Sequence, residues 1–208
     1  MNRKNNYTSQ SETKIITSNK YLMNKIKKGE KEFKKGLGKV MNKIKVVQGD
    51  ITKMKADAIV NAANNSLLGG AGVDGAIHAA AGPKLLDECR TLHGCKTGEA
   101  KITKGYNLPA KYVIHTVGPV YSGTRDDNKL LKSCYISCLN LAKKKGLYSI
   151  IFPAISTGAY GFPAKAATEI AFNAVNNWLD KNTNYPMEVT MCAYDSSMYN
   201  LFKEVAAK

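Results

Sequence analysis

The chain has 208 residues, 44% of them hydrophobic, which suits one well-buried domain plus an appendage on a prior of roughly 100–200 residues per domain. No segment approaches the ~18 consecutive apolar residues of a membrane span, and the polar N-terminus lacks the apolar core of a signal peptide. Five scattered cysteines, an odd number, do not form a disulfide framework and suit a reducing compartment. These features predict a soluble cytoplasmic protein without a membrane span.

Residues 1–43 form a basic extension. They carry twelve lysine or arginine residues against three glutamates, a net charge of +9, whereas the other residues carry 19 basic and 13 acidic side chains, a net +6. The polar composition of residues 1–20 predicts disorder, and an apolar stripe from Leu22 to Val40, interrupted by glycines, predicts a weak helix. Two roles stay open. The extension docks on or solubilises the domain, or its lysines make a weak contact with a polyanion or membrane surface.

From Ile44 onward, short β-type runs alternate with apolar stripes at helical spacing. The predicted strands are Ile44–Val47, Ala58–Asn61, Tyr112–Val117, Ser149–Phe152 and Glu188–Tyr194. The predicted helices carry the stripes Val73/Ile77/Ala80, Leu85/Cys89/Leu92, Leu131/Tyr135/Cys138/Leu141, Ile170/Ala174/Trp178 and Met198/Phe202/Val205. This alternation predicts a three-layer α/β domain over residues 44–208 with a central mixed, largely parallel sheet. Ligands of such sheets bind beyond the carboxyl ends of the strands, so the chemistry should follow strands directly.

Two polar motifs follow the first two predicted strands. In the first, GDIT, Asp50 can accept a hydrogen bond from an exocyclic amine such as that of adenine, although aspartate is also common in turns that bind nothing. In the second, NAANN over residues 61–65, the carboxamides both donate and accept, which suits the vicinal hydroxyls of a ribose. A polar turn is an equally simple interpretation of the second motif.

A glycine-rich loop, LGGAG over residues 68–72, leads into a predicted helix. Its bare N–H groups and the positive end of the helix dipole suit an anion, but its spacing matches neither a nucleoside-triphosphate loop nor G-x-G-x-x-G. Asp74 lies in the first helical turn, where the dipole stabilises an acid by ~0.3–1 kcal/mol. A carboxylate there also repels the anion that the loop attracts. This conflict indicates a role for Asp74, such as aiming a water molecule.

A second phosphate-type loop, STGAYGFP over residues 156–163, lies between a predicted strand and a helix. Two such loops bracket a pyrophosphate better than a single phosphate. Tyr160, at the centre of this loop, could pack on a sugar face, and Tyr194, which ends the last predicted strand, could stack on a base. Together the four motifs predict a ligand with one base, two phosphates and a hydroxyl-rich sugar.

These motifs resemble the MacroD branch of the macrodomain family in order and spacing, from about Ile44 to the C-terminus. The resemblance rests on GDIT, NAAN, GGxGVDGAIH with a following AAG, LPAKYVIHTVGP and STGxYGFP. It implies an α/β/α macrodomain sandwich that binds ADP-ribose and removes mono-ADP-ribose from modified Asp and Glu side chains of proteins. It also implies deacetylation of O-acetyl-ADP-ribose in the same pocket.

The resemblance also implies which residues bind ADP-ribose. Asp50 would hold the adenine amine beside the N–H of Ile51, Tyr194 would stack on adenine, and the two loops would wrap the diphosphate. The expected binding residues are Asp50, Ile51, Asn61, Gly70, Ala71, Gly72, Val73, Ser156, Thr157, Gly158, Ala159, Tyr160 and Tyr194.

For catalysis, Asp74 matches the acidic residue of the branch, and Asn64 would bind the distal ribose and orient the scissile bond. His78 lies four residues after Asp74 on the same helix face, where it either tunes Asp74 or is a structural histidine. One departure is Ala71, because the family loop commonly has a glycine there. Its methyl group costs nothing at negative φ but restricts the loop at positive φ, so slower turnover or altered loop dynamics is one hypothesis.

Other classes of function stay open. A macrodomain that only reads ADP-ribose would have the same cleft, but it would not need the GVDGAIH helix start. A nucleic-acid-binding protein fits the charge but lacks a base-reading module, and Cys89, His93 and Cys95 offer only three zinc ligands. We therefore predict a monomeric hydrolase that uses no cofactor or metal ion, with ADP-ribose and ADP-ribosylated proteins as partners.

Overall fold

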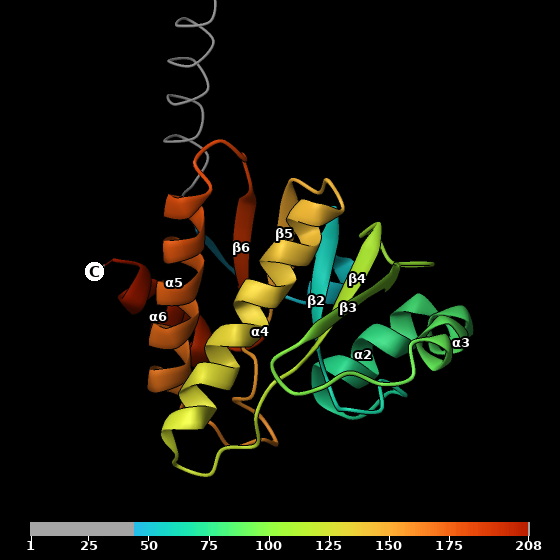
Figure 1. Cartoon of the computed structure of the whole chain (residues 1–208), viewed down its shortest axis with the longest axis horizontal. Coiled ribbons are helices and arrows are strands. Elements are labelled where there is room, and N and C mark those ends of the chain that lie inside the picture. The colour runs from blue at the N-terminus through green and yellow to red at the C-terminus, as the bar shows by residue number, and fades with distance from the viewer. Residues whose placement is uncertain (1–43, 208) are drawn as a thin grey trace, which may run out of the picture.

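The computed structural model describes residues 44–207 and places six strands in one sheet with helices on both faces (Figure 1). The strands are β1 Lys45–Gln48, β2 Ala58–Ala63, β3 Ala100–Lys104, β4 Tyr112–Val117, β5 Ser149–Phe152 and β6 Glu188–Ala193. Their order is β1-β6-β5-β2-β4-β3, and every neighbouring pair is parallel except β3 with β4. The predicted three-layer architecture with a mixed, largely parallel sheet is confirmed.

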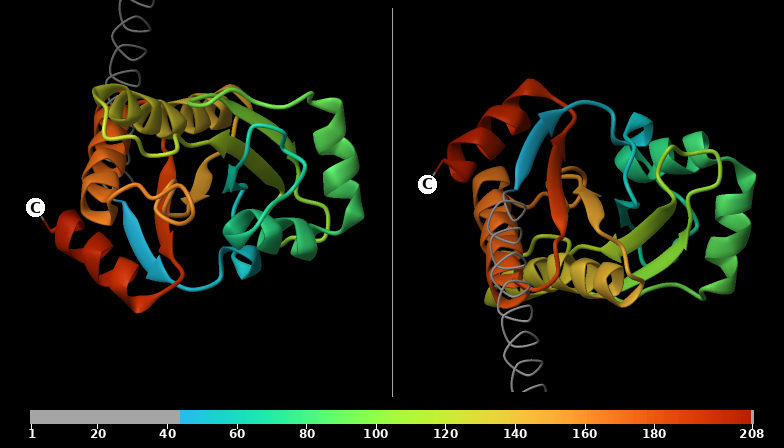
Figure 2. Two further views of the ribbon diagram at one scale, coloured as in Figure 1. Left: turned by 90° about the horizontal axis from the view of Figure 1, so that it is seen from below. Right: turned by 90° about the horizontal axis from the view of Figure 1, so that it is seen from above.

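Helices cover both faces of this sheet. They are the 3₁₀ helix η1 Ile51–Lys53 and the α-helices α2 Gly72–Ala81, α3 Pro83–Thr91, α4 Arg125–Lys144, α5 Ala164–Lys181 and α6 Ser196–Ala206. Helices α4 and α5 pack on one face, α2 and α3 on the other, and α6 packs on α5 beside β1 and β6 (Figure 2). Successive residues of β2 alternate between the two cores: Val60 joins the α4–α5 side, and Ile59 the α2–α3 side.

Several strand ends differ from the prediction by one or two residues, and Tyr194 lies just beyond β6 instead of ending it. Two differences are larger. No strand is predicted at Ala100–Lys104, where β3 forms the antiparallel edge of the sheet. Two lysines and only one large apolar side chain, Ile102, give this segment a weak strand signal, and lysine is typical of protected edge strands. The stripe of α2 is wrong in its last member, because Ala80 is exposed and Ala81 is buried. The next buried residue of α2 therefore comes four positions after Ile77 and not three.

Residues 1–43, and with them the predictions of disorder, a weak helix and a polyanion contact, lie outside the described residues. The domain boundary at residue 44 therefore stays a prediction. Within residues 44–207, no helix combines the length and the apolar character that a membrane span requires. All five cysteines are buried and free, as expected for a chain without a disulfide framework.

Candidate active site

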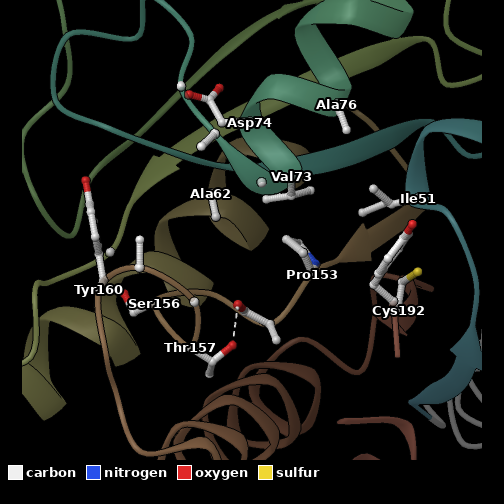
Figure 3. A pocket seen from close by; sticks show the side chains of 18 of the residues that line it. Ile51, Ala62, Val73, Asp74, Ala76, Pro153, Ser156, Thr157, Tyr160 and Cys192 are labelled. Atoms are coloured by element: carbon white, nitrogen blue, oxygen red, sulfur yellow. Dashed lines mark hydrogen bonds between the residues drawn. The ribbon is translucent and has the colours of Figure 1, made fainter. Parts of the chain in front are cut away.

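A cleft of about 770 Å³ opens at the carboxyl ends of the parallel strands, lined by segments that follow β1, β2, β4, β5 and β6. Fourteen of the sixteen predicted site residues line it: Asp50, Ile51, Asn64, Gly70, Ala71, Gly72, Val73, Asp74, Ser156, Thr157, Gly158, Ala159, Tyr160 and Tyr194. Asp74 and Tyr160 lie towards one end, and Ile51 and Cys192 towards the other (Figure 3). The cleft is therefore elongated, with chemically different ends.

The glycine-rich loop and the start of α2 form one wall of this cleft. Ala71, the N-cap residue of α2, makes no side-chain cap hydrogen bond, so the N–H groups of the first turn are left for a ligand. Its φ of −98° is extended backbone, and its methyl group therefore adds no backbone strain. The left-handed positions of the loop are Gly69 and Gly72, with φ of 86° and 62°. The hypothesis that Ala71 restricts the loop finds no support in the backbone.

The Ser156–Pro163 loop forms the opposite wall. Ser156 adopts a φ of 66° and is buried, and its Oγ has no hydrogen-bond partner within residues 44–207. The loop is tied to the segment after β4, because Tyr121 donates its backbone N–H to the Tyr160 carbonyl at 2.8 Å. A Cβ on Gly118 would overlap with Ser156 Oγ. Glycine at position 118 is therefore required by the close approach of the two segments.

The end of the cleft near β1 and β6 carries an acid and an exposed aromatic ring. Asp50 Oδ1 accepts hydrogen bonds from Thr52 N at 3.0 Å and Thr52 Oγ1 at 2.7 Å. These bonds, above all that from the Thr52 hydroxyl, lower the pKa of Asp50, so the side chain is an ionised acceptor. Tyr194 is 82% exposed, which leaves its ring free to cover a planar ligand.

The other end of the cleft holds the predicted catalytic residues. Asp74 is only 3% exposed, and its Oδ1 accepts a hydrogen bond from Asn61 Nδ2 at 2.7 Å. His78 Nε2 lies 3.4 Å from the same oxygen without hydrogen-bond geometry. Asp74 Oδ2 has no partner within residues 44–207, and a Cβ on Gly70 would come within 2.8 Å of it. The carboxylate therefore lies directly beneath the glycine-rich loop with one oxygen unused.

Three of the predicted polar residues have contacts or positions that differ from a simple place in the cleft wall. Asn64 lines the cleft, but its Nδ2 donates to Gly69 O at 2.8 Å and its Oδ1 accepts from Ser66. One Nδ2 hydrogen is left for a ligand. Asn61 is fully buried and, like His78, is not among the lining residues. The side chain of Asn61 therefore supports Asp74 from behind and does not itself face the cleft.

A second buried polar side chain, which was not among the predicted site residues, lies behind Asn61. Asn61 on β2 is the register partner of His115 on β4, and its Nδ2 lies 3.1 Å from His115 Nδ1. His115 Nε2 lies 2.9 Å from Thr103 Oγ1 on β3. Burial, with a smaller contribution from His78, lowers the pKa of His115 to about 3, so its ring is neutral. The visible signal was a polar residue within each of two apolar strands, AIVNAA and YVIHTV.

Within residues 44–207, one group of side chains has metal-ligand proximity: His78, Cys89 and His115, whose ligand atoms lie within 4.8 Å of one another. This group differs from the Cys89, His93 and Cys95 set considered from the sequence. Burial raises the pKa of Cys89 to about 11, so a thiol and not a thiolate faces the histidine. His115 already has hydrogen-bond partners at both ring nitrogens. We therefore assign His115 and Cys89 to hydrogen bonding and not to a metal site.

Comparison with known proteins gives consistent matches. The Macro domain family model matches residues 60–171. The chain is 55% identical over 169 residues to a Macro domain-containing protein of Methanosarcina mazei, covering 81% of this chain and 90% of the relative. It is 50% identical over 182 residues to the ADP-ribose glycohydrolase MACROD1 of Bos taurus, covering 86% of this chain. The match covers only 55% of that relative's length.

Among solved structures, the chain is similar to the macrodomain of Oceanobacillus iheyensis. A variant of that protein with a glycine replaced by valine and ADPR bound aligns with a TM-score of 0.74 at 44% identity, covering 78% of this chain and 90% of the other. Two further structures of it, with an aspartate or an asparagine replaced by alanine, align with the same TM-score.

Proposed function

The chain belongs to the macrodomain family, and from this premise we propose that it hydrolyses the bond between mono-ADP-ribose and modified Asp or Glu side chains of proteins. The ADP-ribose would lie along the cleft, with the same pocket serving O-acetyl-ADP-ribose as a second substrate. Support comes from the bovine relative, which is named an ADP-ribose glycohydrolase, and from the O. iheyensis macrodomain with ADPR bound.

The two ends of the cleft suit the two ends of this ligand. An ionised Asp50 can accept the adenine amine with Ile51 N–H alongside, and the exposed Tyr194 ring can stack on the base. The uncapped start of α2 and the Ser156–Tyr160 segment face one another across the middle of the cleft, where the diphosphate would lie. This leaves the distal ribose at the Asp74 end, near Asn64 and Tyr160.

The observation that carries the hydrolase assignment is the unused Oδ2 atom of Asp74. A buried acceptor without a partner costs ~1–3 kcal/mol, so its retention indicates a partner that arrives with the substrate. Asp74 also lies at the N-terminus of α2 beside the proposed phosphate site, where its charge opposes ligand binding. A protein that only reads ADP-ribose gains nothing from this arrangement.

In the proposed reaction a water molecule attacks C1″ of the distal ribose, and the bond from C1″ to the protein carboxylate oxygen breaks. The released carboxylate is a good leaving group, so no strong general acid is needed. Asp74 Oδ2 orients the water and takes up its proton, Asn64 donates to the ribose, and a phosphate oxygen of the substrate can share the base role. Base assistance of this kind contributes ~10²–10⁴ in rate. Oxocarbenium-like charge builds up on the ribose as in glycoside cleavage.

The spacing of substituted residues in the O. iheyensis macrodomain supports these roles. Its substituted asparagine precedes its substituted aspartate by ten residues, and its substituted glycine precedes that aspartate by three. Asn64 and Ala71 precede Asp74 by the same intervals. In that protein a valine at the glycine position leaves ADPR bound, so the smaller Ala71 is compatible with binding here.

Replacing Asp74 with alanine tests the proposal. We expect release of ADP-ribose from an auto-modified transferase to fall by ~10²–10⁴, while calorimetry shows ADP-ribose affinity within a few-fold of the unmodified protein. Asp87→Ala is the matched control, because Asp87 forms an exposed pair with Arg90 on α3, away from the cleft. Persistent turnover in Asp74→Ala would refute the mechanism. Binding without release by the unmodified protein would identify a reader of ADP-ribose instead.

A further inference from the structure

We propose that His115 is a positioning residue, which acts through Asn61 to hold the Asp74 carboxylate in its working orientation. This inference rests on the proposed function. It concerns three strand residues beneath the cleft: Asn61 on β2, His115 on β4 and Thr103 on β3. All three are at most 2% exposed and occupy adjacent places across the α2–α3 face of the sheet.

The hydrogen-bond pattern fixes which ring nitrogen of His115 carries the proton. A carboxylate oxygen only accepts, so the Asn61 atom 2.7 Å from Asp74 Oδ1 is the amide nitrogen. The second hydrogen of that nitrogen points to His115 Nδ1 at 3.1 Å, which must therefore be an acceptor. The ring proton of neutral His115 then resides on Nε2, where Thr103 Oγ1 at 2.9 Å accepts it.

This tautomer determines the orientation of the Asn61 carboxamide. If the proton moved to Nδ1, it would face the amide hydrogen, and Asn61 would have to rotate by half a turn to present its oxygen. That rotation would place the Asn61 oxygen against Asp74 Oδ1, where two acceptors repel one another. His115 therefore selects the Asn61 orientation that donates to Asp74. With Oδ1 held in this way, Oδ2 points to the space between Gly70 and Asn64.

The position of these residues argues for this role over simple packing. Cys89 Sγ lies 3.7 Å from His115 Nε2, but Ile59, Val113 and Ala63 in the same core are apolar, and an apolar side chain would fill the place of His115 without a desolvation penalty. The Oδ1 atom of Asn61 also stays without a partner within residues 44–207. The hydrogen-bonded row of Thr103, His115 and Asn61 thus carries an energetic cost for the fold, and through Asn61 it is connected to Asp74.

Two substitutions at His115 separate positioning from packing. His115→Leu keeps roughly the volume but removes the acceptor, whereas His115→Asn places an amide oxygen where Nδ1 stood. We expect turnover of His115→Leu to fall by about tenfold to hundredfold, the range of a misplaced catalytic group. ADP-ribose affinity should change less than about threefold, because only the transition-state interaction is lost. His115→Asn should recover most of the turnover.

A spectroscopic measurement and a third variant cover the case in which His115→Leu fails to fold. Nitrogen-15 NMR of the unmodified full chain should show Nε2 protonated and Nδ1 unprotonated, a result that does not depend on any enzymatic activity. Thr103→Val, which removes the acceptor for Nε2–H, should lower turnover several-fold with unchanged ADP-ribose affinity. A proton on Nδ1, normal turnover in His115→Leu, or equal losses in the Leu and Asn variants would each overturn the inference. Absence of turnover in the unmodified protein would instead refute the proposed function.

Discussion

Lowering the pH from 7 to 5 is expected to remove about 2 kcal/mol of unfolding free energy through His115 alone. The pKa of His115 is lowered from 6.5 to about 3 by burial, whereas in the unfolded chain it returns to its ordinary value. Between these pKa values the unfolded state binds a proton that the folded state does not, so stability rises with pH. The contribution of neutral His115 to the unfolding free energy is fully present above pH 6.5 and is lost progressively as the pH falls towards 3. The value of about 2 kcal/mol at pH 5 follows because pH 5 lies 1.5 units below the pKa of the unfolded state, and each unit contributes about 1.36 kcal/mol.

Urea denaturation of the unmodified protein and of His115→Asn at pH 7, 6 and 5 measures this contribution. The titratable groups near His115 are His78 from α2, Cys89 from α3 and its register partner Lys101 on β3, with Asp74 linked to it through Asn61, and all are present in both proteins. The unmodified protein should therefore lose about 2 kcal/mol more than the variant between pH 7 and pH 5. Parallel losses in the two proteins would show that burial does not lower the pKa of His115 in the folded state and would refute this prediction.

Three further predictions concern the glycine-rich loop. Gly70→Ala would place a methyl group 2.8 Å from Asp74 Oδ2, so single-turnover release of ADP-ribose should slow by about tenfold to hundredfold; an unchanged rate would mean that Oδ2 does not take part. Gly72→Ala, at a φ of 62°, should cost ~1–2 kcal/mol in urea denaturation, whereas Ala71→Gly should change stability by less than about 0.5 kcal/mol. Turnover should not change in Ala71→Gly, and a marked acceleration would show that the Ala71 methyl group does restrict the loop.

The strands that could be predicted from sequence are the buried ones. A strand covered on both faces is apolar at nearly every position, as in Tyr112–Val117 and Ser149–Phe152, and such runs are visible without knowledge of their neighbours. Ala100–Lys104 is different, because it forms a strand only through its pairing with β4. The residues of Ala100–Lys104 alone do not indicate that pairing, so an edge strand of mixed composition gave only a weak signal.

The cleft could be predicted because parallel strands bring their carboxyl ends together. Motifs that follow β1, β2 and β5 are far apart in sequence, yet the topology places them around one opening. The roles of individual side chains were harder to predict from the sequence. Asn61 and Asn64 belong to one motif, but Asn61 is still within β2 and points into the α2–α3 core, whereas Asn64 lies beyond the strand. The end of a strand, which sequence locates only to within a few residues, decides which of the two can meet a ligand.

Strand register explains why the role of His115 could not be predicted from the sequence and why its ring can act on Asn61. Its motif, IHTVGP, reads as strand followed by turn, and only the alignment of β2 with β4 sets its ring beside Asn61. Replacing Asn61, His115 and Thr103 together by apolar residues would remove the buried polar side-chain atoms of all three, including the unpaired Asn61 Oδ1, so the packing of the fold alone gives no reason to keep them. Asp74 does give a reason. Among the described residues, Asn61 is the sheet residue that donates to this carboxylate in the first turn of α2, and its amide needs an acceptor behind it to stay correctly oriented. This row of hydrogen bonds therefore ends at Asp74 Oδ1, and the other oxygen of the same carboxylate, Oδ2, is the unused one under the glycine-rich loop.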